Sequence, residues 1–479
     1  MKRDIIGEQT KIWGVGIVFS IQEAHMNSKL STSNAIIIGS MLFGLFFGAG
    51  NLIFPVHMGQ EAGANWISAN IGFLITAIGI PFLGVVAIGY SGSNGLQDLA
   101  SRVHPYYAKF FTFLLYIAIG PAFAIPRCAT VSYQIGASSY FGESSQTIAL
   151  AVFSAIFFMV ALLFSLKPSK LMDYIGKGLN PLFLFFLALL VIAVVINPMG
   201  NPSTAAVSGA YKDISFFKGL TEGYNTMDGL ASLAFGILVI NAIKNVGIEK
   251  PRDIARGVLK AGVVVLILMS AIYTLLVYTG ADSLGVLQVS KNGGIALGEI
   301  TKHYFSEYGA LLLGIIVTLA CLKTTIGLIT ACSETFEELF SQSLSYRNYV
   351  YVFTVISFLV ANLGLTQIIE LSIPALMFLY PLAISLILVT LVGLLFNQRR
   401  AIYILPTICA GICAIGDFLA ATPKSVQALG WVQNLLSVFK QLPYFDLGMS
   451  WVVPTLIGLG ISIIYCLAVK EKNSFTGYM

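Results

Sequence analysis

The sequence predicts an all-α integral membrane protein with twelve transmembrane helices, and its composition and apolar runs both lead to this conclusion. Of the 479 residues, 57% are hydrophobic and only 10% are charged, and the mean hydropathy is +0.85. Soluble domains carry roughly 25% charged residues, so the surface of this chain is too apolar to face water. A soluble enzyme, a nucleic-acid-binding protein and a disordered chain are therefore excluded.

The apolar runs are about 20 residues long, which is enough for a helix to cross a hydrocarbon core about 30 Å thick. Because lipid offers no hydrogen-bond partners to a peptide backbone, we expect these runs to be helical. The twelve expected spans are residues 33–57, 65–91, 106–138, 146–166, 174–196, 219–243, 255–280, 308–333, 348–364, 371–396, 401–421 and 447–469.

The distribution of Lys and Arg predicts that both termini lie in the cytoplasm. With the amino terminus inside, the expected cytoplasmic segments contain nineteen of the 27 Lys and Arg residues, and the expected external segments contain six. Cytoplasmic loops of membrane proteins carry such an excess. The two remaining cations, Arg127 and Lys323, fall within expected helices.

The cytoplasmic segment before the first span, residues 1–30, contains a short apolar run at 12–21. This run is too short to span a membrane and lacks a small-residue cleavage site, so it fits neither a spanning helix nor a signal peptide. We expect Met26 to be the natural start and residues 1–25 to be a start-site artefact, with Met1 as the alternative.

The first and sixth expected spans contain residues that interrupt a helix. The first reads GLFFGAGNLIFP over 44–55, where each glycine costs about 1 kcal/mol in a helix interior. The sixth reads GYNTMDGLASLAFG over 223–236, which places the carboxylate of Asp228 beside a glycine within the membrane. Close helix packing at the glycines is the alternative explanation.

These two spans begin two five-helix blocks, residues 31–196 and 197–396, and residues 397–479 hold two further helices and the cytoplasmic C-terminus. Because five is odd, the two blocks have opposite orientations, which is the arrangement of an inverted repeat. Paired interrupted spans in two such halves indicate the binding site of a secondary transporter. A half-helix starting after Gly50 presents free N–H groups to a carboxylate, and unwound carbonyls suit an ammonium or sodium ion. A zwitterionic amino acid carries both charges.

Five segments closely resemble the branched-chain amino acid carriers of the BrnQ type, and the likeness runs from about Ser31 to Leu467. The segments are FGLFFGAGNLIFP (43–55), GPAFAIPRCATVSYQIG (120–136), GYNTMDGLASLAFG (223–236), ACLKTTIGLITACSE (320–334) and ANLGLTQIIELSIPALMFLYP (361–381). The resemblance implies a cation-coupled importer of leucine, isoleucine and valine in the bacterial plasma membrane. It also implies the amino acid–polyamine–organocation superfamily, with a LeuT-type 5+5 inverted fold and two accessory helices.

The resemblance further implies positions for the substrate and the coupling ion. The amides of Ala49 and Gly50 are expected to hold the substrate carboxylate. The full set of implied substrate residues is Gly48, Ala49, Gly50, Asn51, Thr226 and Asp228. The implied sodium ligands are the carbonyls of Gly44, Phe47 and Cys321 and the hydroxyls of Thr324 and Thr325. Besides sodium, with protons as the alternative, we expect no cofactor, and we expect only the amino acid and membrane lipid as partners, with no obligate protein partner.

The two intramembrane cations leave alternatives open, because ionisable groups at that depth are costly and usually functional. Arg127 suits an outer gate or a structural pair with a carboxylate. Lys323 lies beside the implied sodium hydroxyls and suits proton coupling in place of sodium. It is also about 100° around the helix from Thr324, which favours contact with a neighbouring helix.

Other functions remain as alternatives to a branched-chain carrier. A carrier of another small neutral amino acid is one, since a methylene is worth only about 1–3 kcal/mol and the sequence does not rank leucine, isoleucine and valine. Tyr133 and Phe235 are candidates to enclose the aliphatic group. A channel would need rings of pore-lining polar groups, and an enzyme would need a nucleophile–base or metal pair. Neither pattern occurs at membrane depth, so we expect a carrier rather than a channel or an enzyme.

Overall fold

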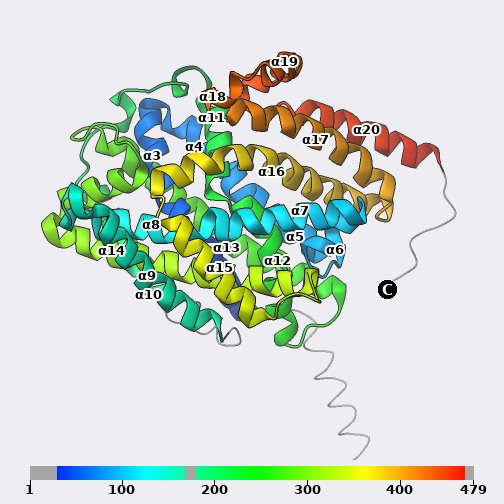
Figure 1. The fold of residues 1–479 in the computed structure, drawn as a ribbon, viewed down its shortest axis with the longest axis horizontal. Helices are drawn as coiled ribbons and strands as arrows, with labels where there is room; N and C mark the ends of the chain where they lie inside the picture. Colours follow the sequence, from blue (N-terminus) through cyan, green and yellow to red (C-terminus); the bar gives the residue numbers. More distant parts are fainter. Residues whose placement is uncertain (1–29, 168–179, 470–479) are drawn as a thin grey trace, which may run out of the picture.

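The computed structural model describes residues 30–167 and 180–469, and all regular structure in these ranges is helical (Figure 1). The predicted all-α class is therefore confirmed. Residues 1–29, which include Met26 and the proposed start-site artefact, lie outside the described part.

The α-helices are α2 (Thr32–Phe46), α3 (Ala49–Ala62), α4 (Trp66–Leu74), α5 (Ile80–Ser91), α6 (Leu96–Ser101), α7 (Pro105–Ile117), α8 (Ala124–Gly136), α9 (Gln146–Ser165), α10 (Asn180–Ile196), α11 (Tyr211–Glu222), α12 (Asp228–Asn245), α13 (Pro251–Ser283), α14 (Gly293–Leu339), α15 (Tyr346–Ala361), α16 (Leu365–Gly393), α17 (Arg400–Ala421), α18 (Lys424–Gln427), α19 (Gly430–Phe439) and α20 (Val452–Ala468). Short 3₁₀ or π segments are η1 (Gly63–Asn65), η2 (Ile75–Gly79), η3 (Ala118–Ala122), η4 (Ser138–Tyr140), η5 (Glu143–Ser145), η8 (Pro202–Thr204), η9 (Gly223–Thr226), η10 (Leu394–Phe396) and η11 (Phe445–Leu447).

Within residues 30–167 and 180–469, seven helical stretches are long and apolar enough to cross a membrane. The number is eight if the pair Tyr211–Thr226 and Asp228–Asn245, bent by 46°, forms one span. The shorter apolar helices are Thr32–Phe46, Pro181–Ile196 and Val452–Ala468. Each of the twelve expected segments overlaps helical structure, whereas the number that crosses a membrane stays a prediction.

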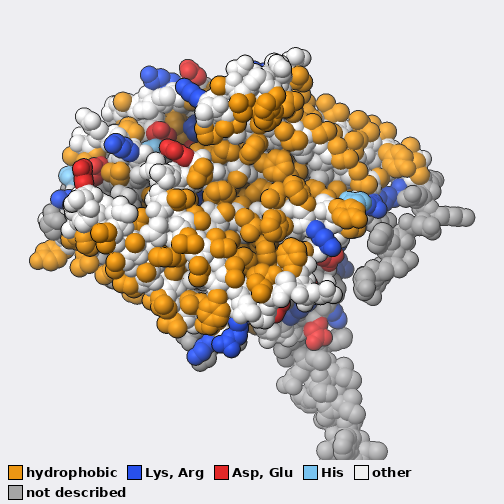
Figure 2. All heavy atoms as spheres, in the orientation of Figure 1, with side chains coloured by type: hydrophobic (Ala, Val, Ile, Leu, Met, Phe, Trp, Pro, Cys, Tyr) orange, Lys and Arg blue, Asp and Glu red, His pale blue; other side chains and the backbone are white. Residues whose placement is uncertain are grey.

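The surface agrees with a membrane environment. Hydrophobic side chains cover the middle of the face shown in Figure 2, and charged side chains gather at the upper left and along the lower and right-hand edges. Ile156 on α9 and Ile196 at the end of α10 are 63% and 76% exposed. Exposed apolar area of this extent marks contact with a membrane or a partner.

Helices from distant parts of the chain surround α3. It packs against α13, α14 and α8, and α12 packs against α5 and α2. The contact between α3 and α13 depends on two glycines. A Cβ on Gly59 would lie 2.1 Å from the carbonyl oxygen of Val277, and one on Gly280 would lie 2.0 Å from that of Val56. This close approach holds α13 where its side chains reach the start of α3.

The last helices lie to one side of this group. The helix α16 packs against α17, and α17 packs against α20. Figure 1 shows α17 and α20 side by side at one edge of the molecule, away from α9 and α10. The main contacts of the interrupted helices lie elsewhere, since α3 packs against α13 and α14, and α12 packs against α5.

Candidate functional site

The first span breaks between α2 and α3. The helix α2 ends at Phe46, and Phe47 and Gly48 are extended, with ψ angles of 90° and −156°. The side-chain oxygen of Asn51 accepts the Gly48 N–H at 2.9 Å, which fixes the angle at which the chain re-enters a helix. The first-turn N–H groups of α3 have no partners within the helix, so the break presents backbone donors to its surroundings.

The sixth span breaks at Met227. The 3₁₀ turn η9 ends at Thr226, Met227 has a left-handed conformation with φ 63°, and α12 begins at Asp228. The hydroxyl of Thr226 accepts the backbone N–H of Asp228 at 3.3 Å. This break therefore carries a carboxylate at the first position of its second helix, where the helix dipole favours negative charge.

Hydrogen bonds join the two breaks directly. The side-chain amide of Asn51 donates to Oδ2 of Asp228 at 2.5 Å, and the hydroxyl of Tyr273 on α13 donates to the same oxygen at 2.9 Å. Asn51 and Tyr273 are also hydrogen-bonded to each other. Asn51 and Asp228 are each 2% exposed, and Tyr273 is fully buried. The structure thus brings together two residues expected from sequence, Asn51 and Asp228, which are 177 positions apart.

Sequence reasoning missed Tyr273. An aromatic residue in an apolar helix is most often core, and nothing local distinguishes Tyr273 from Tyr278 five residues later. Its hydroxyl at membrane depth was the available signal, because a buried tyrosine hydroxyl usually finds a hydrogen-bond partner.

A small cavity lies between the breaks. Its volume is about 30 Å³, which admits water but not an amino acid, so side chains must move for a larger ligand to bind. It is lined by Leu45, Phe46, Gly48, Gly50, Asn51, Ile119, Ala124, Arg127, Cys128, Thr226, Met227, Asp228, Ala231, Phe235, Thr324 and Leu328.

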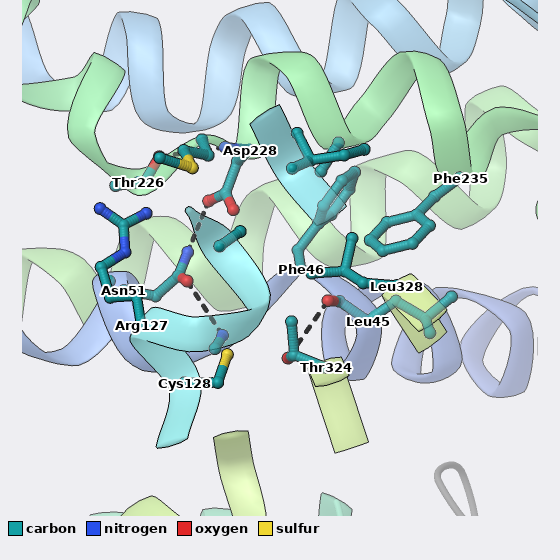
Figure 3. Close-up of a pocket in the computed structure, with 16 residues that line it drawn as sticks. Leu45, Phe46, Asn51, Arg127, Cys128, Thr226, Asp228, Phe235, Thr324 and Leu328 are labelled. Atoms are coloured by element: carbon teal, nitrogen blue, oxygen red, sulfur yellow. Dashed lines mark hydrogen bonds between the residues drawn. The ribbon is translucent and has the colours of Figure 1, made fainter. Parts of the chain in front are cut away.

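The lining is divided by polarity. Figure 3 shows Arg127, Asn51 and Thr226 on one side of the cavity and Phe235 and Leu328 on the other. Among the sixteen lining residues, only Arg127 and Asp228 are charged. The cavity therefore offers one cation, one anion and an apolar wall.

Thr324 brings oxygen atoms together at the other edge of the cavity. Its hydroxyl lies 3.4 Å from the carbonyl oxygen of Leu45 (Figure 3) and 3.4 Å from that of Phe47. The carbonyl of Phe47 is among the implied sodium ligands, and that of Leu45 is a further oxygen atom at this place. The next residue, Thr325, is fully buried, and its Oγ1 has no hydrogen-bond partner among the described residues. Gly44 and Cys321 are buried as well, but they do not line this cavity.

Lys323 points away from the cavity. Its Nζ lies 4.4 Å from the ring centroid of Phe183 on α10 and 5.5 Å from that of Phe43 on α2, and its side chain is fully buried. The adjacent Thr324 lines the cavity and Lys323 does not. The ammonium therefore contacts aromatic rings between neighbouring helices, as the helical offset of 100° predicts.

The two aromatic residues expected to enclose the aliphatic group, Phe235 and Tyr133, line different cavities. Phe235 lines the cavity, whereas Tyr133 lines a second cavity and donates its hydroxyl to the side chain of Gln146 at 2.5 Å. A stacked pair that sequence reasoning missed, Tyr224 and Tyr380, joins η9 to α16 with ring centroids 4.2 Å apart. A Cβ on Gly229 would lie 2.7 Å from the Tyr380 ring.

With this geometry established, comparison with known proteins identifies the family. The family described as branched-chain amino acid transport protein matches residues 31–469. The chain belongs to this family. Branched-chain amino acid permeases BrnQ from Lactobacillus delbrueckii subsp. lactis and Bacillus subtilis are 44% and 43% identical to it, over 93% and 90% of this chain and 100% and 97% of theirs. The branched-chain amino acid transport system 2 carrier protein of Pseudomonas aeruginosa is 38% identical, over 91% of this chain and 97% of its own.

This branched-chain amino acid transport protein also resembles solved structures. Mhp1, a nucleobase-cation-symport-1 family transporter, aligns in a closed conformation with bromovinylhydantoin bound at a TM-score of 0.55, with 13% identity over 92% of this chain and 95% of Mhp1. Inward-facing Mhp1 aligns at a TM-score of 0.57, with 12% identity over 94% and 97%. At such low identity, the likeness shows only that this chain and Mhp1 share a fold. The relatives are named permeases and carriers and not enzymes, and the described residues contain seven helical stretches long and apolar enough to cross a membrane. This member of the family is therefore a multi-pass membrane transporter.

Proposed function

We propose that this transporter is a sodium-coupled symporter that carries leucine, isoleucine and valine into the cell by alternating access. The observation that carries the proposal is the meeting of two interrupted helices across one cavity. One break supplies N–H groups, and the other supplies the carboxylate of Asp228, linked to it through Asn51. Interrupted spans at the midplane form the substrate and ion sites of secondary transporters.

The same proposal includes the finer architecture. Twelve spans form two inverted repeats, residues 31–196 and 197–396, followed by two accessory helices in 397–479. The protein lies in a bacterial plasma membrane, with both termini in the cytoplasm. Support comes from the positions of the two breaks in the first and sixth expected spans, from the peripheral place of α17 and α20 (Figure 1), and from the excess of basic residues in the expected inner segments.

The cavity suits a branched-chain amino acid in both charge and polarity. The ammonium group of the substrate would bind near Asp228 and the carboxylate near the start of α3, while the aliphatic group lies against Phe46 and Phe235. An apolar wall of this kind discriminates poorly between aliphatic groups that differ by one methylene. We therefore expect leucine, isoleucine and valine to compete for one site.

A sodium site fits the oxygen atoms next to the cavity. The carbonyls of Leu45 and Phe47 and the hydroxyl of Thr324 converge, and the hydroxyl of Thr325 is buried without a described partner. Oxygen ligands of this type suit hard cations. A bound sodium ion would stabilise the extended segment between α2 and α3, whose carbonyls would otherwise lack helical partners.

Proton coupling is the second candidate, and Lys323 is the observation that favours it. A fully buried ammonium is costly unless its environment compensates, and here the compensation includes two aromatic rings. Loss of a proton when α2 or α10 moves would link transport to a proton gradient. The position of Lys323 outside the cavity favours sodium as the primary proposal.

The test is uptake of radiolabelled leucine into proteoliposomes under an imposed sodium gradient and, separately, under a proton gradient alone. Accumulation that needs sodium supports the proposal. Accumulation driven by protons alone overturns the sodium assignment and makes Lys323→Ala the next variant. Saturable accumulation above equilibrium under either gradient excludes a channel, and failure under both gradients would overturn the branched-chain substrate.

A further inference from the structure

A buried arginine faces the candidate substrate cavity from α8. Arg127 is 2% exposed and lines the cavity, and its Nη1 has no hydrogen-bond partner among the described residues. Figure 3 shows the guanidinium extending along the cavity wall on the side of Thr226. Burying a cationic donor without a partner costs free energy. The Nη1 atom is therefore available to donate a hydrogen bond to a ligand in the cavity.

The local structure explains why Arg127 points inward. The π segment η3 precedes α8 and contains Gly120, whose φ and ψ of −94° and −126° are not helical. The guanidinium carbon lies 5.3 Å from the ring centroid of Phe54 on α3, a cation–π contact. A kink before the arginine and a ring beneath it thus hold the cation against the helix whose N-terminus faces the cavity.

Asp228 does not neutralise this arginine by direct contact. The two side chains line the same cavity, but they do not form a salt bridge within 4.0 Å of the kind that joins Lys218 to Glu222 and Arg256 to Asp253. Asn51 and Tyr273 instead donate hydrogen bonds to this carboxylate. The guanidinium of Arg127 and the carboxylate of Asp228 therefore face a common cavity without forming an ion pair.

We infer that Arg127 binds the carboxylate of the transported amino acid, together with the N-terminus of α3, while Asp228 binds its ammonium group. This inference rests on the proposed function and assigns one charge of the cavity to each charge of a zwitterion. The pairing explains how a site with two buried charges accepts a substrate of zero net charge, since each ionic group of the ligand replaces lost water with an opposite charge. Arginine suits the role because its planar fork matches a carboxylate with two hydrogen bonds.

The test compares leucine with two analogues that each lack one charge, 3-methylbutylamine and 4-methylpentanoate. Binding to purified transporter is measured as the ligand-dependent rise in melting temperature, which depends on ligand concentration relative to Kd. In Arg127→Gln we expect leucine affinity to fall about 10- to 100-fold, as for loss of a hydrogen bond to a charged group. Binding of 4-methylpentanoate should be lost, and the affinity for 3-methylbutylamine should change less than twofold.

Asp228→Asn is the matched variant and should show the reverse pattern, with binding of the amine lost and that of the carboxylate retained. Arg127→Lys keeps the charge without the fork, so an intermediate loss of leucine and 4-methylpentanoate affinity is expected, and this variant decides the question if Arg127→Gln does not fold. Equal loss of all three ligands in the arginine variants, or leucine affinity within threefold of the wild type, would overturn the inference and leave Arg127 a gating or packing residue. The wild type is measured in the same assay. If leucine does not raise the melting temperature of the wild type, the proposed function fails, and this outcome is distinct from failure of the inference about Arg127.

Discussion

The two helix breaks that meet at the cavity are built in different ways. The break between α2 and α3 uses extended backbone at Phe47 and Gly48 and is capped by Asn51. The break between η9 and α12 turns through left-handed Met227 and begins its second helix with Asp228. The first therefore exposes main-chain groups, and the second exposes a formal charge. A ligand can bind main-chain groups only where small residues leave them accessible. Binding to a formal charge requires instead that one side chain is held in a fixed position.

The largest effect expected from this difference is at Asp228. Asp228→Asn keeps the shape of the side chain and removes the charge, so leucine uptake should fall about 100-fold or more, as when one member of a buried charge pair is lost. The measurement is radiolabelled uptake into proteoliposomes at matched protein content, with the melting temperature as a control for folding. Uptake within threefold of the wild type would make the carboxylate structural and remove the distinction between the breaks.

The next effect concerns access to the first break. A Cβ on Gly50 would lie 3.3 Å from the Phe54 ring and 3.4 Å from the carbonyl oxygen of Asn225, so Gly50→Ala should retain leucine affinity within about threefold. Gly50→Leu places a branched side chain in the cavity and should weaken leucine binding more than 10-fold. Equal affinities in the two variants would show that the substrate does not approach the start of α3.

A smaller effect should separate the ion from the substrate at the same break. Thr324→Val removes the hydroxyl that lies against Leu45 and Phe47, so the sodium concentration for half-maximal uptake should rise about 10-fold, in the range for loss of a hydrogen bond to a charged group. Thr324→Ser keeps the hydroxyl and is the matched control. An unchanged sodium dependence in the valine variant would contradict a cation site between α2 and α14.

The smallest effect tests the support of the charged break. Tyr273→Phe removes the hydroxyl that donates to Asp228 and should lower leucine affinity about 3- to 10-fold. This is less than the full value of a hydrogen bond to a charged group, because Asn51 still donates to the same oxygen. Tyr133→Phe removes a hydroxyl bonded to Gln146, which lies outside the cavity, and should change affinity less than twofold. If both variants behave alike, the position of Asp228 does not depend on Tyr273.

Much of this site could be predicted because the breaks leave local signals. Glycines and an aspartate inside apolar runs contradict helix propensity and lipid exposure, so the sequence itself marks Gly48, Gly50 and Asp228. The all-α class follows from run length in the same way. These features depend on residues near one another in the chain.

The parts that could not be predicted depend on distant contacts or on rotation about a helix axis. Tyr273 and Tyr380 look like ordinary core aromatics, and their contacts with Asp228 and Tyr224 appear only when α13 and α16 are placed beside the breaks. That the Thr324 hydroxyl lies against the carbonyl of Leu45 depends on where α2 ends, and the sequence places helix ends only to within about two to four residues. Arg127 was recognised as unusual, but its direction depends on the kink at Gly120.

The double use of Asn51 has a thermodynamic consequence. Its oxygen accepts the Gly48 N–H while its amide nitrogen donates to Oδ2 of Asp228. Tyr273 donates to the same oxygen, and a carboxylate accepts up to about four hydrogen bonds, so an ammonium group can bind Asp228 without displacing Asn51. Binding at the carboxylate is therefore thermodynamically coupled to the first break, because free energy that holds Asp228 in place also favours the backbone conformation at Gly48 to which Asn51 is bonded.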